Sequence, residues 1–333
     1  MSFDRLQEKI DALQNPTVVG FDPSLEHIPP QILEHHIAEK ELPLEAAAAA
    51  VFEWGIGLIE AIYDIVPAIK PQMAYYEMLG PEGIMALKMT CDYARTRGMY
   101  VILDGKRNDI GTTAEAYSAA YLGTVKIGAE EVRPFEADAL TVNAYLGSDG
   151  IRPFIDMAIK NDKAIFALVR TSNPSAVELQ DRRVRGAGRD SGTFTAPRSG
   201  NSTAATSQTI SDPSSRFYTV VGDLIEGISR ETIGEYGFTR VGAVVGATYP
   251  EETAFLRARL KNTFFLVPGY GAQGGTAADV AHAFDEHKRG AIVNSSRAII
   301  AAWKKDGANY IDAARAAALT MRDELWHALG LRA

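Results

Sequence analysis

Two acids and a lysine stand at fixed spacing in the segment Asp104-Gly-Lys106-Arg-Asn-Asp109. Alternation along an extended chain places Asp104 and Lys106 on the same face. Asp109 follows in a loop, ahead of a helix that Thr112 and Glu115 are expected to open as a capping box. The functional interpretation is an Asp–Lys–Asp cluster in which the carboxylates hold the lysine ammonium protonated and aimed. The alternative interpretation is a strand-to-helix turn whose charges form surface ion pairs.

A glycine-rich turn at 268–275 contains the pattern Gly269-x-Gly271-x-x-Gly274, which also occurs in dinucleotide-binding folds. Only about sixty residues follow the turn, too few for such a fold, and the next strand ends without an acid for a ribose. The turn therefore predicts a phosphate cradle of backbone N–H groups, with Arg297 as a charged clamp. The alternative is that the glycines only form a tight turn.

Short apolar runs rich in β-branched residues position these polar groups. Eight such runs occur along the chain. Few of them alternate polar with apolar residues, which is typical of strands buried on both faces of a parallel sheet. Eight strands alternating with helices predict a single-domain α/β protein, a (β/α)₈ TIM barrel over residues 1–333; the competing layout is a doubly wound open sheet. The runs are Thr17–Phe21, Val66–Lys70, Met99–Asp104, Ala139–Asn143, Ala164–Arg170, Val241–Gly246, Thr263–Val267 and Gly290–Asn294, with helical patterns at Leu44–Tyr63, Gly83–Arg97, Thr113–Lys126 and Ala277–His287.

The active site of a TIM barrel lies at the carboxyl ends of its strands. Asp22 follows the first predicted strand, Lys70 ends the second and Asp104 ends the third. Ser172 follows the fifth strand and Arg297 the eighth. The barrel is therefore expected to gather these side chains at one mouth, although each of them alone is also typical of a solvated loop.

One segment, 186–215, departs from the alternation of strands and helices. Of its 30 residues, 18 are Gly, Pro, Ser or Thr, and no apolar periodicity runs through it. Burial cannot offset the entropy cost of ordering such a segment. We therefore expect a flexible Ser/Thr/Gly-rich lid insertion between the fifth and sixth strands.

Composition excludes several classes of function. Lys and Arg total 34 against 42 Asp and Glu, and the net charge of −8 argues against a nucleic-acid-binding surface. No apolar run approaches the roughly 20 residues of a membrane span, and the N-terminal segment lacks the apolar core of a signal peptide, so we expect a cytoplasmic protein. Cys91 is the single cysteine, and the six histidines lack zinc-site spacing, so neither a disulfide nor a metal site is expected.

Taken together, the motifs resemble orotidine 5′-phosphate decarboxylase, in the longer bacterial subgroup of that family. The match follows family order from Val18 to Arg297, which is most of the chain. The D-x-K-x-x-D pattern alone is shared with sugar-phosphate decarboxylases and aldolases of the same superfamily, whereas the full set is specific. The matching segments are Gly20-Phe-Asp22-Pro, Ile69-Lys70-Pro-Gln, Asp104-Gly-Lys106-Arg-Asn-Asp109-Ile110-Gly-Thr-Thr113, Thr141-Val-Asn-Ala-Tyr-Leu-Gly147, Thr171-Ser172-Asn-Pro, Pro268-Gly-Tyr-Gly-Ala-Gln273-Gly-Gly and Arg297.

The resemblance implies a homodimeric barrel that converts orotidine 5′-monophosphate to UMP and carbon dioxide without a cofactor, the last step of de novo pyrimidine synthesis. It implies that Lys106 protonates C6 of the pyrimidine and that Asp104 sits against the departing carboxylate. Lys70 and Asp109 would complete an alternating charge network, with Asp109 reaching in from the neighbouring subunit.

The resemblance also assigns contacts with a small-molecule nucleotide. Asp22 and Lys70 would meet the ribose hydroxyls, and Ser172 would hydrogen-bond the pyrimidine ring. Gln273 and Arg297 would hold the phosphate. The neighbouring subunit would add two residues besides Asp109. Its Ile110 would form a wall of the pyrimidine site, and its Thr113 would contact the ribose.

Two other functions remain open at this point. The nearer is a magnesium-dependent sugar-phosphate decarboxylase or aldolase of the same superfamily, which carries an acid where this chain has Lys70, a residue that would repel the cation. The other, from a different class, is a non-catalytic phosphate-binding barrel. The insertion at 186–215 departs from the family's lid, and Gln180 is the candidate lid residue for contact with substrate.

Overall fold

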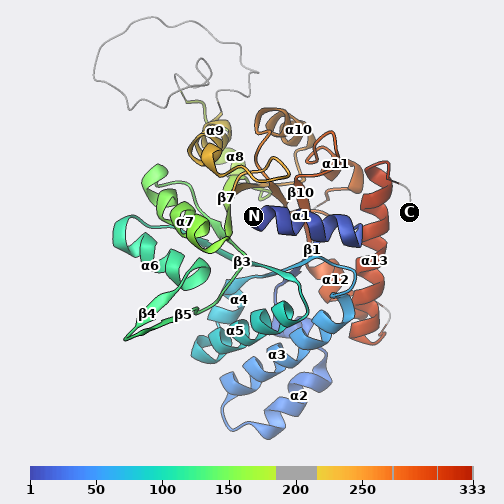
Figure 1. Cartoon of the computed structure of the whole chain (residues 1–333). Coiled ribbons are helices and arrows are strands. Elements are labelled where there is room, and N and C mark those ends of the chain that lie inside the picture. Colours follow the sequence, from blue (N-terminus) through green and yellow to red (C-terminus); the bar gives the residue numbers. More distant parts are fainter. Residues whose placement is uncertain (185–215, 272–273, 306, 332–333) are drawn as a thin grey trace, which may run out of the picture.

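Eight parallel strands close into a barrel in the computed structural model, which describes residues 1–184, 216–271, 274–305 and 307–331 (Figure 1). The order around the barrel is β1-β10-β9-β8-β7-β6-β3-β2, so the first strand pairs with the last. The predicted TIM barrel is confirmed, and the doubly wound sheet is wrong because an open sheet would leave two edge strands. The barrel strands are β1 (Thr17–Phe21), β2 (Ala68–Pro71), β3 (Tyr100–Arg107), β6 (Ala139–Val142), β7 (Ala164–Arg170), β8 (Val241–Val245), β9 (Phe265–Val267) and β10 (Ala291–Ser295).

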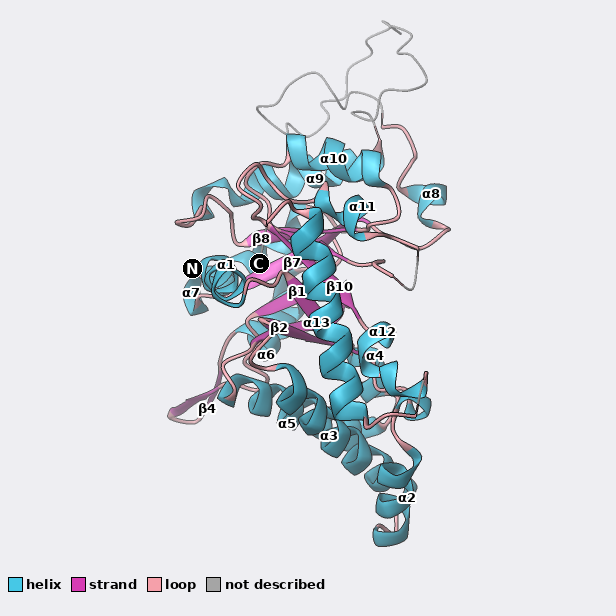
Figure 2. Ribbon diagram, turned by 90° about the vertical axis from the view of Figure 1, so that its right-hand side faces the viewer, coloured by secondary structure: helices cyan, strands magenta, loops and turns pink. Residues whose placement is uncertain are grey.

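Helices surround the barrel (Figure 2). The longest begins at Pro43, where proline is tolerated because the first helical N–H has no partner, and continues through the alanine run 46–50. The α-helices are α1 (Ser2–Leu13), α2 (Pro30–Glu39), α3 (Pro43–Ile62), α4 (Met73–Glu77), α5 (Gly80–Thr96), α6 (Gly111–Leu122), α7 (Ser148–Asn161), α8 (Ala176–Leu179), α9 (Phe217–Ser229), α10 (Pro250–Arg259), α11 (Ala277–Ala281), α12 (Arg297–Ile300) and α13 (Tyr310–Ala328), with 3₁₀ turns at Leu25–His27, Arg230–Thr232 and Ala302–Lys304.

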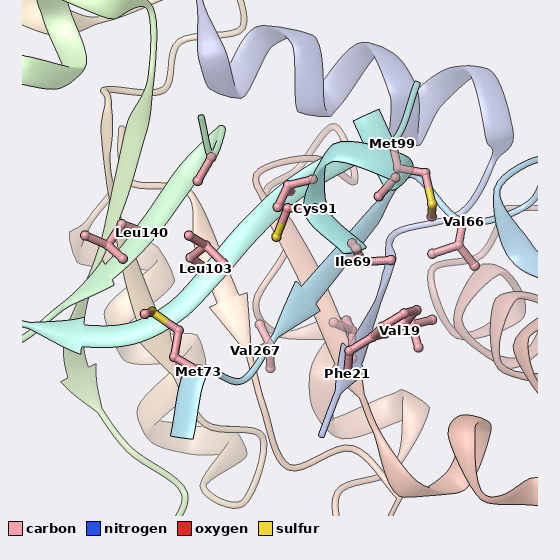
Figure 3. Close-up of a cluster of buried hydrophobic side chains, with 14 of the residues drawn as sticks. Val19, Phe21, Val66, Ile69, Met73, Cys91, Met99, Leu103, Leu140 and Val267 are labelled. Atoms are coloured by element: carbon pink, nitrogen blue, oxygen red, sulfur yellow. The ribbon is translucent and has the colours of Figure 1, made fainter. Parts of the chain in front are cut away.

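Two apolar layers hold the barrel, because successive strand residues point to opposite faces. Val18 belongs to the cluster inside the barrel, and its neighbour Val19 belongs to the layer between strands and helices. Figure 3 shows part of the outer layer, in which Leu103 and Cys91 both lie among buried side chains. Burial raises the pKa of the Cys91 thiol to about 12, so this single cysteine is a packing residue and no nucleophile.

The helix α1 closes the amino-terminal end of the barrel, where it lies across the strands in Figures 1 and 2. Phe3 is fully buried, and its ring centroid lies 4.9 Å from that of Phe166 and 5.0 Å from that of Phe264. Leu6 and Ile10 continue the apolar face of the helix into the same cluster. The barrel therefore opens only at the carboxyl ends of its strands.

The strand β3 extends three residues past its predicted end at Asp104. Its register against β6 shifts on the way: Leu103 pairs with Leu140, but Arg107 pairs with Val142, so four steps on β3 match two on β6. Lys106 lies in this irregular segment with φ of 46°, a left-handed conformation that costs a non-glycine residue roughly 1–2 kcal/mol. The bulge aims residues at the barrel mouth that a regular strand would place elsewhere.

A β-hairpin replaces the end of the helix predicted over Thr113–Lys126. The helix α6 stops at Leu122, because Gly123 passes so close to the Met157 sulfur that a Cβ there would collide with it. The strands β4 (Val125–Ile127) and β5 (Glu130–Val132) then pair across a two-residue turn and project away from the barrel (Figure 1). Three β-branched residues in this segment favour a strand over a helix.

The predicted capping box at Thr112 and Glu115 is wrong. The helix α6 begins at Gly111 with Ile110 at its N-cap, and no side chain caps it. The helix predicted to reach His287 also ends early, at Ala281, because the Asp285 carboxylate accepts the N–H groups of residues 287 and 289 and forms a turn. The predicted insertion at 186–215 lies outside the described residues.

No helix within the described ranges is both long and apolar enough to span a membrane.

Candidate active site

Asp104 is the centre of the polar cluster at the barrel mouth. Its side chain is buried, and each carboxylate oxygen accepts two hydrogen bonds. Oδ2 accepts from Lys70 Nζ at 2.6 Å and from Gln72 Nε2 at 3.0 Å. Oδ1 accepts from Lys106 Nζ at 2.6 Å and from the Thr141 hydroxyl at 2.8 Å. The carboxylate is therefore fixed in orientation by groups from the strand ends of β2, β3 and β6 and from the residue after β2.

Both members of the buried pair at this site are charged. Burial alone would raise the pKa of Asp104, but the positive charges of Lys70 and Lys106 and their hydrogen bonds outweigh it and hold that pKa well below its usual range. Burial would likewise lower the pKa of Lys70, and the negative charges of Asp104 and Asp22 together raise it above its usual value. Asp22, after β1, is thereby placed in the same electrostatic cluster, as its position at a strand end predicts.

Lys106 differs from Lys70 in its access to solvent. The Lys70 side chain is 7% exposed, whereas the Lys106 side chain is 46% exposed, although both ammonium groups lie 2.6 Å from Asp104. The Lys106 ammonium therefore faces the open mouth while a buried acid holds it in place. Such a group can give a proton to a ligand in the mouth, as the sequence predicts.

The second acid of the predicted cluster lies apart from the first. Asp109 Oδ1 accepts the backbone N–H of Ile110 at 2.8 Å, and no cation pairs with this carboxylate in the part of the chain that the structure describes. Ile110 is 55% exposed, and Thr113 is exposed on the first turn of α6. Within one chain, then, the structure joins Asp104 and Lys106 but leaves these three residues outside their cluster.

The glycine turn is built differently from the predicted phosphate cradle. Gly269, Gly271 and Gly274 all have positive φ, so the pattern provides the left-handed positions of a tight turn. The N–H groups of residues 271, 274 and 275 donate to carbonyls within that turn. The N-terminus of the next helix is also satisfied, because Thr276 and Asp279 form a reciprocal capping box. Within the turn, three of the five N–H groups that the structure describes between residues 269 and 275 are therefore already used.

The structure describes one of the two predicted phosphate residues. Arg297 is exposed at the start of α12, two residues after β10, and no ion pair engages it among the described residues. Gln273 lies outside the described residues. Arg297 is thus a positive group after a barrel strand that is open to an anionic ligand.

The segment after β7 is held by a buried cation that sequence reasoning missed. The Arg170 guanidinium is fully buried, lies 2.5 Å from Glu252 and 3.3 Å from Asp181, and stacks 4.2 Å from the Tyr249 ring centroid. Next to it, Gln180 accepts the Thr171 N–H at 2.9 Å and donates to the Thr171 hydroxyl at 2.7 Å. In this conformation both ends of the Gln180 amide bond Thr171, so the predicted lid contact is tied to the strand end.

Ser172 follows this segment. If Gly246 carried a Cβ, that atom would lie only 2.9 Å from the Cβ of Ser172. The glycine therefore leaves the space in which Ser172 packs against the end of β8. This places Ser172 at the carboxyl end of the barrel, as predicted.

Gln72 and Thr141 are the site residues that the sequence interpretation did not name. Both lie in segments that carry the family resemblance, and both contact Asp104 directly. A signal was present for Thr141, because it is the only polar residue of the otherwise apolar strand 139–142. Gln72 follows Lys70 by two residues, the spacing that returns to the same face of an extended chain.

One group of potential metal ligands occurs in the described ranges: His35, His36 and Glu39 on α2. His36 Nε2 lies 2.7 Å from Glu53, and His35 is exposed. His35 thus lies on the solvated face of α2, whereas His36 is largely covered. This group includes none of the residues around Asp104.

Comparisons with known proteins agree on one family. The model of the orotidine 5′-phosphate decarboxylase / HUMPS family matches residues 53–195. An orotidine 5′-phosphate decarboxylase of Rhodopirellula baltica is 40% identical over 316 residues, 93% of either chain, and one of Clostridium perfringens is 35% identical over 332 residues, 99% of either chain. The solved structure of Leishmania donovani OMP decarboxylase is similar with a TM-score of 0.67 and 27% identity, covering 99% of both chains.

Proposed function

The chain belongs to the orotidine 5′-phosphate decarboxylase family, and from that membership we propose that the cluster around Asp104 converts orotidine 5′-monophosphate to UMP and carbon dioxide. This decarboxylation is a step of pyrimidine synthesis. The observation that carries the proposal is the buried Asp104 carboxylate between two lysine ammonium groups, each at 2.6 Å, at the open end of the barrel.

The first half of the reaction is the loss of the substrate carboxylate. Asp104 cannot move away from an anion placed beside it, because four hydrogen bonds hold it, and its lowered pKa keeps it charged. Two anions about 3 Å apart repel by about 5 kcal/mol at an effective dielectric of about 20. That repulsion disappears when neutral carbon dioxide leaves, so the fixed acid favours departure of the carboxylate.

The second half is protonation of the carbanion at C6 of the pyrimidine. Lys106 holds its proton toward the mouth, and its positive charge favours the developing negative charge more than it favours the ground state. Lys70 is buried on the other oxygen of Asp104, and its charge keeps that acid ionised throughout. Lys70 thus has a role in charge balance and, together with Asp22, in binding the ribose hydroxyls.

The remaining contacts that we propose with substrate are those that the family resemblance implies. Ser172, beyond β7, is proposed to hydrogen-bond the pyrimidine ring. Arg297, beyond β10, is proposed to bind the phosphate together with Gln273. Since the N–H groups of residues 271, 274 and 275 donate within the glycine turn, we propose that these side chains carry much of the phosphate binding.

We further propose that the active unit is a homodimer in which Asp109, Ile110 and Thr113 complete the partner's site. In support, the Asp109 carboxylate has no cation partner in its own described chain, and Ile110 is largely exposed. The neighbouring loop after β6 exposes Tyr145 and Leu146, and both loops border Gly150. An exposed apolar patch beside an unpaired acid is typical of a surface that another subunit covers.

We also propose that the reaction needs no metal or other cofactor and takes place in the cytoplasm. The single cysteine is buried, which suits a compartment where disulfides do not form. Turnover of orotidine 5′-monophosphate by the purified chain in the presence of EDTA tests the function and the rivals together. Undiminished release of carbon dioxide supports the proposal. Turnover that EDTA abolishes would contradict the proposal that no metal is needed. No turnover of this substrate under either condition would point to one of the two rivals, and carbon dioxide release from a sugar-phosphate acid in the presence of Mg²⁺ would then separate the magnesium-dependent class from a binding protein.

A further inference from the structure

The Thr141 hydroxyl joins the backbone of Lys106 to the side chain of Asp104. It is 1% exposed on β6 and makes two hydrogen bonds, at 2.9 Å to the Lys106 backbone nitrogen and at 2.8 Å to Asp104 Oδ1. A backbone N–H can only donate and an ionised carboxylate can only accept. The direction of both bonds is therefore fixed: Lys106 donates to the hydroxyl, and the hydroxyl donates to Asp104.

The Lys106 backbone needs this partner because it has left the regular strand ladder. Between the pairs Leu103–Leu140 and Arg107–Val142 the register shifts, and Lys106 takes a left-handed φ of 46°. A buried N–H without an acceptor is unfavourable, and here a side chain of β6 supplies the oxygen that a strand carbonyl would otherwise supply. The hydroxyl thus stabilises the conformation that brings Lys106 to the mouth.

The same oxygen of Asp104 accepts both the Thr141 hydroxyl and the Lys106 ammonium. Thr141 therefore constrains Lys106 at its two ends, directly at the backbone and through Asp104 at the ammonium. We propose that Thr141 is a positioning residue for proton transfer by Lys106, an inference that rests on the proposed decarboxylase function. Thr141 is 1% exposed and its hydroxyl is engaged both as acceptor and as donor, so the effect should appear in kcat and not in KM.

Thr141→Val removes the hydroxyl at nearly constant volume, and Thr141→Ser keeps it. We expect kcat for orotidine 5′-monophosphate to fall about 10- to 100-fold in the valine variant, the range that loss of such hydrogen bonds produces, while KM and UMP affinity stay within about 3-fold. The serine variant should recover most of the lost kcat. Thr17→Val is the matched control, because Thr17 is also buried on a barrel strand and its hydroxyl has no partner among the described residues.

Several results would overturn the inference. An unchanged kcat in Thr141→Val, an equal loss in the serine variant, or a loss carried by KM would each show that the hydroxyl does not position Lys106. Thermal melting checks that each variant is folded, and Thr141→Ala replaces the valine variant under the same criteria if valine prevents folding. Wild-type and Thr17→Val enzymes that fail to turn over the substrate would instead overturn the proposed function, and this inference with it.

Discussion

The two ends of the barrel differ in what their buried charges contact. At the closed end, α1 inserts Phe3 among aromatic rings, and the buried Lys163 pairs with Asp138. At the open end, Asp104 and Lys70 are buried together inside the mouth, and Asp104 also binds the half-exposed Lys106. Buried charges are tolerated at either end because their partners are in place, and we propose that the pair at the open end serves chemistry whereas the closed end serves stability. Substitutions at the two ends should therefore affect different measurements.

The largest effect is expected from Lys106→Ala at the open end. A positioned proton donor contributes about 10²- to 10⁴-fold, so kcat should fall at least about 1,000-fold while UMP binding and the melting temperature change little. Steady-state kinetics and thermal melting measure the two quantities. Lys88→Ala, which removes a surface lysine from α5, is the control and should leave kcat unchanged. A near-normal kcat for Lys106→Ala would contradict the assignment of this lysine.

Phe3→Ala should instead lower the stability of the fold and leave kcat unchanged. Truncating a fully buried phenylalanine costs about 3–5 kcal/mol of the free energy of unfolding, because it leaves a cavity between α1 and the barrel. The remaining folded enzyme should keep its kcat. Ile37→Ala removes an exposed apolar side chain and should change stability by less than about 1 kcal/mol. If denaturant unfolding gives equal values for the two variants, α1 does not seal the barrel.

Arg297→Ala tests whether this residue at the open end binds the phosphate of the substrate and takes no part in the chemical step. We expect kcat/KM for orotidine 5′-monophosphate to fall about 10- to 100-fold, the value of a charge-assisted contact with phosphate. The nucleoside orotidine, which lacks the phosphate, should lose much less. Arg322→Ala, which truncates a partly exposed arginine on α13, is the control. Equal losses for both substrates would mean that Arg297 does not contact the phosphate.

The smallest expected effect is a partial recovery of activity when two inactive variants are mixed. It tests whether the site at the open end is shared between subunits. Asp109→Ala and Lys106→Ala dimers should each be nearly inactive. After subunit exchange at equal mixing, half of the dimers are heterodimers, and each has one of its two sites intact. About a quarter of wild-type activity should therefore return on a two-fold dimer. If exchange is verified by mass and no activity returns, Asp109 acts within its own chain.

The barrel was predictable because its strands are short apolar runs that stay buried whatever the details of packing. Alternation along an extended strand predicted the closeness of Asp104 and Lys106, but the structure reaches it through a bulge in β3. The bulge was not predictable, because the left-handed Lys106 donates its N–H to a hydroxyl from β6, and no local pattern reports a contact across strands. The hydrogen bonds inside the glycine turn were missed for a related reason, since the same spacing suits a phosphate site or a self-satisfied turn.

The seal made by α1 has a consequence for synthesis of the chain. Phe3 packs against Phe264, so the N-terminal helix cannot take its final place until more than 260 further residues have been made. At roughly 5–20 residues per second on the ribosome, that interval is about 13 to 50 s. For this time the apolar face of Phe3, Leu6 and Ile10 lacks its native cover. The nascent chain thus carries an uncovered apolar helix face through most of its synthesis, and that face is buried when the barrel closes.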